Sequence, residues 1–130
     1  MTITCEKGIR LSGQGWARGC CLLDPNGRTY IGTACMADPE TDDYVMDAVE
    51  VYPDTICRRL GETDVWEHDI VSLDGYTGEV LFGLYDGWHY GFFIRWDGNC
   101  KYRQDAGYWF FGAKRQPEVI GSMLDGRLRK

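Results

Sequence analysis

The chain has 130 residues, 44% of them hydrophobic and 26% charged, which is the composition of one globular domain and excludes a disordered protein. Its net charge of −6 disfavours general nucleic-acid binding, because neutralising phosphates requires concentrated Lys and Arg. No apolar run approaches the ~18 residues that a membrane span needs, so we expect no membrane partner.

In chain order, the amino-terminal half predicts a β-hairpin region. The period-two pattern of strands occupies residues 16–23, 29–35 and 44–51, with a further short strand at 55–58. Between the first two, Asp24-Pro25-Asn26-Gly27 is a strong turn signal. Residues 38–43 are polar and predict a loop.

The carboxyl-terminal half predicts consecutive antiparallel strands over residues 65–111. Strand patterns occupy 65–72, 79–85 and 88–96, and turns are expected at 75–78, 86–87 and 97–98. An aromatic run at 108–111 and an apolar segment at 119–124 follow. A helix is expected only within 39–44, 48–59 or 117–124.

These patterns predict an all-β protein with a single domain, residues 1–130. A small barrel is expected to form largely from residues 65–124, because tight turns between aromatic-rich strands are typical of a meander that closes. Residues 61–130 are then a barrel-like subregion, and residues 1–60 are a β subregion whose hairpin packs on the barrel.

Six cysteines are present: Cys5, Cys20, Cys21, Cys35, Cys57 and Cys100. Their even number is compatible with disulfides, but no basic and apolar leader sends the chain to an oxidising compartment. We therefore expect a cytoplasmic protein with reduced thiols, several of them packed as small hydrophobic side chains.

The most specific motif is Val65-Trp66-Glu67-His68-Asp69-Ile70-Val71. Five others accompany it in order, at residues 16–19, 51–56, 79–83, 91–96 and 118–123. Together they resemble the YopX family of small phage and prophage proteins, in which I-(Y/F/W)-E-G-D-I-V is the most recognisable strand. The resemblance covers nearly the whole chain.

This resemblance implies an SH3-like barrel and a phage or prophage origin, hence the cytoplasm of a bacterial host. It implies no established activity and supplies no catalytic residues. The chain departs from the family at His68, where the family has glycine, and in a shortened turn at residues 61–64. Because histidine tolerates a positive φ far less well than glycine, the departure bears directly on the turn that leads into this strand.

The motif is interpreted as structural, through Trp66, Glu67, Asp69 and Ile70. Strand alternation directs Trp66 and Ile70 towards the core and puts Glu67 and Asp69 on the opposite face. Asp69 is expected near the rim, accepting hydrogen bonds from backbone N–H groups of a turn. The functional alternative is an acid–base pair or a divalent-cation site formed by the two carboxylates.

No pattern predicts catalysis, a metal or a cofactor. Cys20 and Cys21 are adjacent and point to opposite faces of a strand, and the only histidines are His68 and His89. A nucleophile elbow, a phosphate-binding loop and a dinucleotide fingerprint are all missing from the sequence. The sequence therefore predicts a protein that is not an enzyme.

Residues 101–130 contain seven basic and three acidic side chains, a local charge of +4. Their cations alternate with aromatic residues and form a candidate binding surface: Lys101, Tyr102, Arg103, Tyr108, Trp109, Lys114 and Arg115. This composition suits single-stranded nucleic acid, through stacking and phosphate contacts. It equally suits a barrel whose aromatic residues are inside and whose cations lie outside.

Two functions from different classes remain. The first is a non-catalytic interaction module that binds another protein or a second copy of itself, since five tryptophans and eight tyrosines exceed what one small barrel can bury. The alternative is a nucleic-acid-binding domain that uses residues 101–130, with the acidic segment 38–54 on the opposite side.

Overall fold

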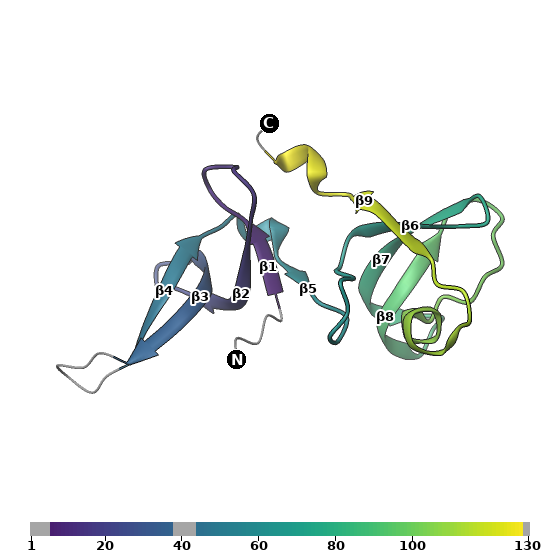
Figure 1. Ribbon diagram of the computed structural model, residues 1–130, viewed down its shortest axis with the longest axis horizontal. Coiled ribbons are helices and arrows are strands. Elements are labelled where there is room, and N and C mark those ends of the chain that lie inside the picture. The colour runs from purple at the N-terminus through teal and green to yellow at the C-terminus, as the bar shows by residue number, and fades with distance from the viewer. Residues whose placement is uncertain (1–5, 38–43, 129–130) are drawn as a thin grey trace. The chain divides into compact units, whose positions relative to one another are not determined.

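The computed structural model describes residues 6–37 and 44–128 (Figure 1). The predicted loop at 38–43 lies outside these residues. The described chain is mostly β, in two antiparallel sheets, so the all-β prediction is confirmed. It divides into two compact units, Met1–Arg58 with Gly126–Lys130 and Arg59–Asp125. In the described ranges, none of the helices has the length and apolar character to cross a membrane.

The first unit contains a five-stranded sheet with the order β4-β3-β2-β1-β5. Its elements are β1 (Glu6–Ile9), β2 (Trp16–Leu23), β3 (Thr29–Ala37), β4 (Tyr44–Glu50), the 3-10 turn η1 (Pro53–Thr55) and β5 (Cys57–Arg58). The strands predicted at 16–23, 29–35 and 44–51 and the Asp24 turn are confirmed, with the Asp24 side chain accepting a hydrogen bond of 2.6 Å from the Asn26 N–H. The strand predicted at 55–58 is shorter, because residues 53–55 form the 3-10 turn. Ala17, Ile31 and Val51 form a buried cluster.

The second unit contains a four-stranded sheet with the order β8-β7-β6-β9. Its elements are β6 (Asp69–Leu73), β7 (Tyr76–Tyr85), β8 (His89–Trp96), the π-helix η2 (Tyr108–Gly112) and β9 (Glu118–Ser122), and the 3-10 turn η3 (Asp125–Arg127) follows. A two-residue turn joins β6 to β7, with φ of 52° at Asp74 and 85° at Gly75, the signature of a type I′ hairpin. The reversal is therefore tighter than predicted, since Gly78 lies inside β7.

The core of the second unit forms between the long β7–β8 hairpin and segments that precede and follow it in the chain. Its buried cluster consists of Leu60, Val65, Val71, Val80, Ile94, Ala106 and Phe110. In the described residues the edge strands β8 and β9 do not pair with each other, so the sheet is open. The SH3-like barrel over residues 65–124 stays a prediction.

The prediction of strands through residue 111 is wrong after Trp96. Residues 97–104 form no strand, and the aromatic run becomes the π-helix η2, outside every segment in which a helix was expected. The Ala113 N–H donates to the Tyr108 carbonyl at 2.8 Å, which closes this wide turn. Aromatic residues favour strands, but here the helical turn carries Phe110 into the core.

Candidate functional site

The motif around Trp66 is a turn followed by a strand, and not one continuous strand. The Asp69 carboxylate accepts a hydrogen bond of 2.9 Å from the Trp66 N–H, and the Asp69 N–H donates to the Trp66 carbonyl at 3.1 Å. Trp66 and Asp69 are 6% and 4% exposed. The expected burial of Trp66 and the expected bond from Asp69 to a turn N–H are confirmed, although Asp69 is buried and not at the rim.

This turn changes the alternation that was predicted across the motif. Because β6 begins only at Asp69, Val71 faces the core and is fully buried, whereas Ile70 is half-buried. The expectation that Ile70 faces the core is therefore wrong. The prediction that Glu67 and Asp69 share a strand face is also wrong, because Glu67 lies in the turn before β6.

His68 adopts the left-handed conformation that its glycine counterpart would favour, with φ of 70°. Its backbone is bound on both sides, the N–H to Val80 O at 2.6 Å and the carbonyl to the Met123 N–H at 2.8 Å. Its ring nitrogen Nδ1 lies 2.9 Å from Glu79 Oε2, and Arg95 binds the other oxygen of Glu79 at 3.0 Å. These contacts hold the turn in place without a glycine.

Part of the predicted binding surface is hydrogen-bonded to the β6–β7 turn. Arg115 binds both carboxylate oxygens of Asp74, and the Tyr102 hydroxyl donates to Asp74 Oδ2 at 2.8 Å. The hydrogen bond from Arg115, followed by that from Tyr102, lowers the pKa of Asp74, and Asp74 raises the pKa of Arg115. The Arg115 charge is thus already compensated within the chain.

The aromatic residues of the same surface pack on one another. The indole N–H groups of Trp96 and Trp109 both donate to the Arg103 carbonyl, at 3.0 and 2.7 Å. The Tyr102 ring packs against both, with centroids 5.3 Å from Trp96 and 5.5 Å from Trp109. Tyr102 and Trp109 therefore stabilise the path of the chain after β8.

The remaining cations of the predicted surface are exposed. The Arg103 guanidinium lies 4.3 Å from the centre of the Tyr108 ring, a cation–π contact. Lys101 and Lys114 are exposed at the surface. Of the seven predicted residues, Tyr102 and Trp109 pack in the aromatic cluster, and Tyr102 and Arg115 bind the Asp74 turn. Arg103 contacts Tyr108. The acidic segment 38–54, expected opposite this surface, lies partly outside the described residues.

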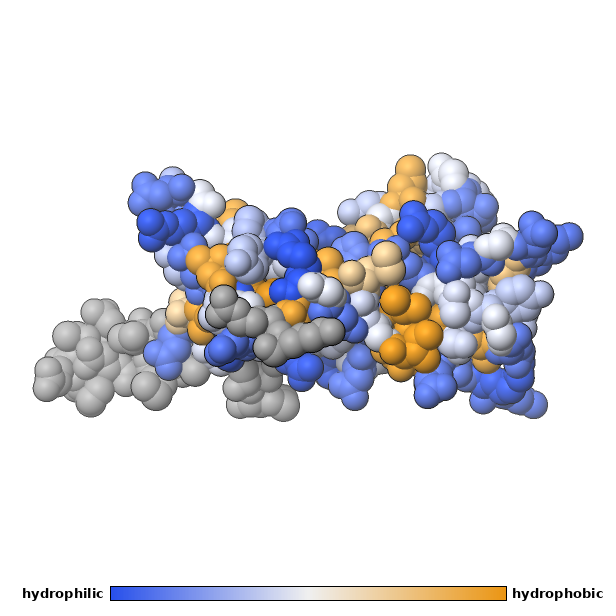
Figure 2. Space-filling view, turned by 90° about the horizontal axis from the view of Figure 1, so that it is seen from above, coloured by the Kyte–Doolittle hydropathy of each residue, from blue (hydrophilic) through white to orange (hydrophobic). Residues whose placement is uncertain are grey.

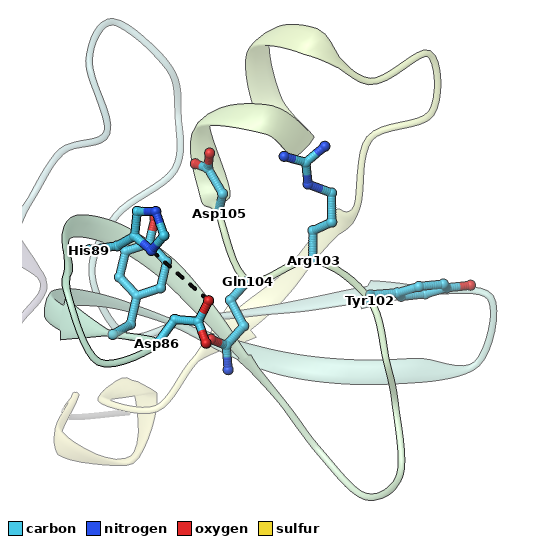
Figure 3. A pocket seen from close by; sticks show the side chains of 7 residues that line it. Asp86, His89, Tyr102, Arg103, Gln104 and Asp105 are labelled. Carbon is cyan, nitrogen blue, oxygen red and sulfur yellow. Dashed lines mark ion pairs between the residues drawn. The ribbon is translucent and has the colours of Figure 1, made fainter.

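Sequence reasoning missed a cavity of about 350 Å³ beside the end of the β7–β8 hairpin (Figure 3). The hairpin contributes Tyr85, Asp86 and His89, and residues 102–105 form the other side. No local sequence pattern indicates that residues 102–105 cross beside the hairpin. The Ile94 N–H donates to the Gln104 carbonyl at 2.7 Å, and this hydrogen bond holds residues 102–105 beside β8.

Burial raises the pKa of the Tyr85 hydroxyl, and the carboxylates of Asp105 and Asp86 raise it further. The Tyr85 ring stacks on the rings of Phe93 and His89, with centroid distances of 4.9 and 5.4 Å. Asp86 Oδ2 lies 4.0 Å from His89 Nδ1. The cavity therefore has an aromatic wall and two carboxylates.

The end of the same hairpin carries large exposed side chains. Leu84, Trp88 and Tyr90 are 64%, 79% and 73% exposed. Leu84 and Tyr90 are cross-strand partners, and Trp88 lies in the connecting turn with its ring 4.5 Å from that of His89. Figure 2 shows that hydrophobic residues on the drawn face occur in small groups on a mostly hydrophilic surface.

Four cysteines among the described residues have free thiols: Cys20, Cys21, Cys57 and Cys100. Burial, followed by the nearby Glu6 carboxylate, raises the pKa of Cys21, which disfavours a reactive thiolate there. In the part of the chain that the structure describes, no three His, Cys, Asp or Glu side chains gather in a group that could hold a metal ion.

No protein-family model matches the chain, and neither the curated proteins nor the solved structures include a significant match. The resemblance to the YopX family therefore stays a prediction. The functional conclusion depends on the chain's own geometry.

Proposed function

We propose that this chain is a non-catalytic interaction module that binds another protein through the end of its β7–β8 hairpin. The observation that carries the proposal is the exposure of Leu84, Trp88 and Tyr90 at one end of a single hairpin. Tryptophan and tyrosine are the residues most enriched among those that dominate binding energies, and exposed apolar groups tend to mark partner surfaces.

The position of these residues on the hairpin supports the proposal. Along one face of β7 and β8, the buried pair Val80–Ile94 is followed by the half-buried pair Phe82–Phe92 and then by Leu84–Tyr90. The apolar stripe of the core thus continues beyond the core into solvent. Because eight cross-strand pairs hold the hairpin, its exposed side chains can be buried with little further loss of backbone entropy.

Nucleic acid is the weaker alternative. Phosphate binding by residues 101–130 needs accessible cations, but Asp74 already compensates Arg115, and Arg103 stacks on Tyr108. The aromatic rings that would stack on bases pack on one another instead.

The proposal of a protein-binding module also includes membership of the YopX family, an SH3-like second unit, a phage or prophage origin and a cytoplasmic location in a bacterial host.

The test compares tagged parent protein with a variant that combines Leu84→Ser, Trp88→Ser and Tyr90→Ser. The matched control is Leu23→Ser, which removes an equally exposed apolar side chain (79%) from β2 in the first unit. Each protein is incubated with bacterial lysate, with and without nuclease, and retained proteins are quantified by mass spectrometry. Circular dichroism checks that all three are folded, and sedimentation velocity measures self-association.

We expect the parent and the Leu23→Ser protein to retain a partner, or to self-associate, about tenfold more strongly than the hairpin variant, with no effect of nuclease. Equal retention by all three proteins would contradict the proposal. Loss of every retained protein on nuclease treatment would favour the nucleic-acid alternative.

A further inference from the structure

We propose that the cavity beside the hairpin binds a positively charged side chain of the protein partner, a guanidinium or an ammonium group. This inference rests on the proposed function and specifies the chemistry of the partner: a cationic side chain next to apolar residues. The cavity lies on the hairpin face of Tyr85 and His89, opposite the face of Leu84 and Tyr90. Trp88 in the connecting turn is the exposed residue beside the cavity, because its ring lies 4.5 Å from that of His89, so a partner that contacts Trp88 can also reach the cavity.

The first argument is the aromatic wall. Tyr85 forms the centre of a row of rings in which Phe93 and His89 stack on it at interplanar angles of 20° and 25°. Trp88 extends the row beyond His89. Because Phe93 and His89 cover the faces of Tyr85, the ring that a cation can reach is Trp88 at the exposed end of the row. The face of an aromatic ring attracts cations, and a planar guanidinium can stack on it while its edges donate hydrogen bonds.

The second argument is the charge of the cavity. Its carboxylates belong to Asp86 at the hairpin turn and to Asp105 on the opposite side, and both act on the Tyr85 hydroxyl. One oxygen of Asp105 accepts the Gly107 N–H at 2.9 Å, which fixes the orientation of this carboxylate. Carboxylates held on two sides of a small cavity suit a group that donates several hydrogen bonds and carries positive charge.

The third argument concerns Arg103, the one arginine or lysine in the lining. Its guanidinium stacks on Tyr108, and Figure 3 shows it pointing away from Asp86. In the described residues, the ion pairs of this unit do not include Arg103. Arg103 therefore forms an ion pair with neither carboxylate, and the net charge of −6 adds attraction for a cationic partner.

The size of the cavity limits what it can hold. At about 350 Å³ it lies at the lower end of the range of ligand sites, roughly 300–1,000 Å³. This space suits one long side chain. An anion such as phosphate would meet both carboxylates, so we expect the cavity to exclude it.

The test uses the full chain and two small probes with the same shape. N-acetyl-arginine amide is titrated at low ionic strength, and N-acetyl-citrulline amide serves as its uncharged counterpart, while NMR follows the ring resonances of Tyr85 and His89. We expect saturable shifts with the arginine probe and at least about fivefold weaker binding of the citrulline probe, because only the first carries the charge. Inorganic phosphate is the anionic control.

Variants assign the effect to the cavity. Asp86→Asn removes an exposed charge at a turn, and we expect it to weaken binding of the arginine probe about two- to fivefold, the range of one exposed ion pair. The matched control is Glu118→Gln on β9, at the opposite edge of the sheet, which should leave binding unchanged. Asp105→Asn should act in the same direction as Asp86→Asn.

Equal binding of the two probes, binding of phosphate at this site, or equal effects of Asp86→Asn and Glu118→Gln would overturn the inference. These failures differ from a failure of the proposed function. If the hairpin variant loses its protein partner but the arginine probe does not bind, only the cationic specificity is wrong. If the probe binds but no hairpin-dependent partner or self-association exists, the proposed function is wrong.

Discussion

Residues 65–73 and residues 101–115 both contain aromatic and charged side chains, but they stabilise the second unit in different ways. In the first segment, the buried polar contact is local, since Asp69 binds the N–H of Trp66 three residues earlier. In the second, Arg115 and Tyr102 bind Asp74, which lies 41 and 28 residues away. The local contact is buried and the distant contacts are exposed.

The difference shows why cations beside aromatic residues do not by themselves indicate a binding surface. The carboxylate that compensates Arg115 belongs to a turn that no local pattern connects with residues 101–115. Burial also separates the two segments energetically, because exposed ion pairs contribute little to stability and buried hydrogen-bonded groups contribute more. We therefore expect substitutions in the first segment to reduce stability most.

The largest effect is expected for Trp66→Ala. Removing this buried ring should lower the free energy of unfolding by about 3–5 kcal/mol, the range for large-to-small core substitutions. Trp88→Ala is the matched control, because Trp88 is exposed and its loss should change stability by less than about 0.5 kcal/mol. Urea denaturation followed by circular dichroism measures both, and similar losses for the two variants would contradict the burial of Trp66.

Asp69→Ala should cost about 1–3 kcal/mol, because the buried Trp66 N–H loses its acceptor. Asp69→Asn keeps a side-chain oxygen in the same place and should cost less. The two variants are compared in the same urea titration. If Asp69→Ala is as stable as the parent protein, the carboxylate is not structural, and the alternative interpretation as an acid–base or cation-binding group is favoured.

His68→Val should cost about 1–2 kcal/mol, since a β-branched residue tolerates the left-handed conformation at φ of 70° poorly. His68→Gly removes the backbone strain but also the contact with Glu79, so its stability should stay within about 1 kcal/mol of the parent. Thermal unfolding of the pair tests this ranking. Both variants lack the ring contact, so a glycine variant less stable than the valine variant would contradict a left-handed backbone at this position.

The smallest effect is expected for the second segment, and it depends on pH. Asp74 has a pKa below its ordinary value of 3.8, so its contribution is present above that value and is lost as the pH falls through the lowered pKa. Arg115→Gln should therefore lower the urea midpoint slightly at neutral pH, and the difference should shrink below about pH 3.8. Asp74→Asn is the control, because it should make the midpoint insensitive to Arg115→Gln at every pH.

Local chemistry accounts for what the sequence determined by itself. Strand alternation predicted β2, β3 and the β7–β8 hairpin, and the turn residues at 24–27 and 86–87 predicted the reversals between these strands, because both signals act over a few residues. The burial of Trp66 and the bond from Asp69 to a turn N–H were also predictable, since both partners lie within one turn of the chain.

Tertiary contacts decided the rest. The aromatic run at Tyr108–Gly112 became helical because Phe110 packs with Val80 and Ile94, which come from strands far earlier in the chain. The phase of β6 depended on the His68 turn, whose backbone is bound by β7 and by Met123, and the cavity formed only where residues 102–105 cross beside β8. Each of these outcomes joins residues distant in sequence, and no periodicity or turn signal carries information over that distance.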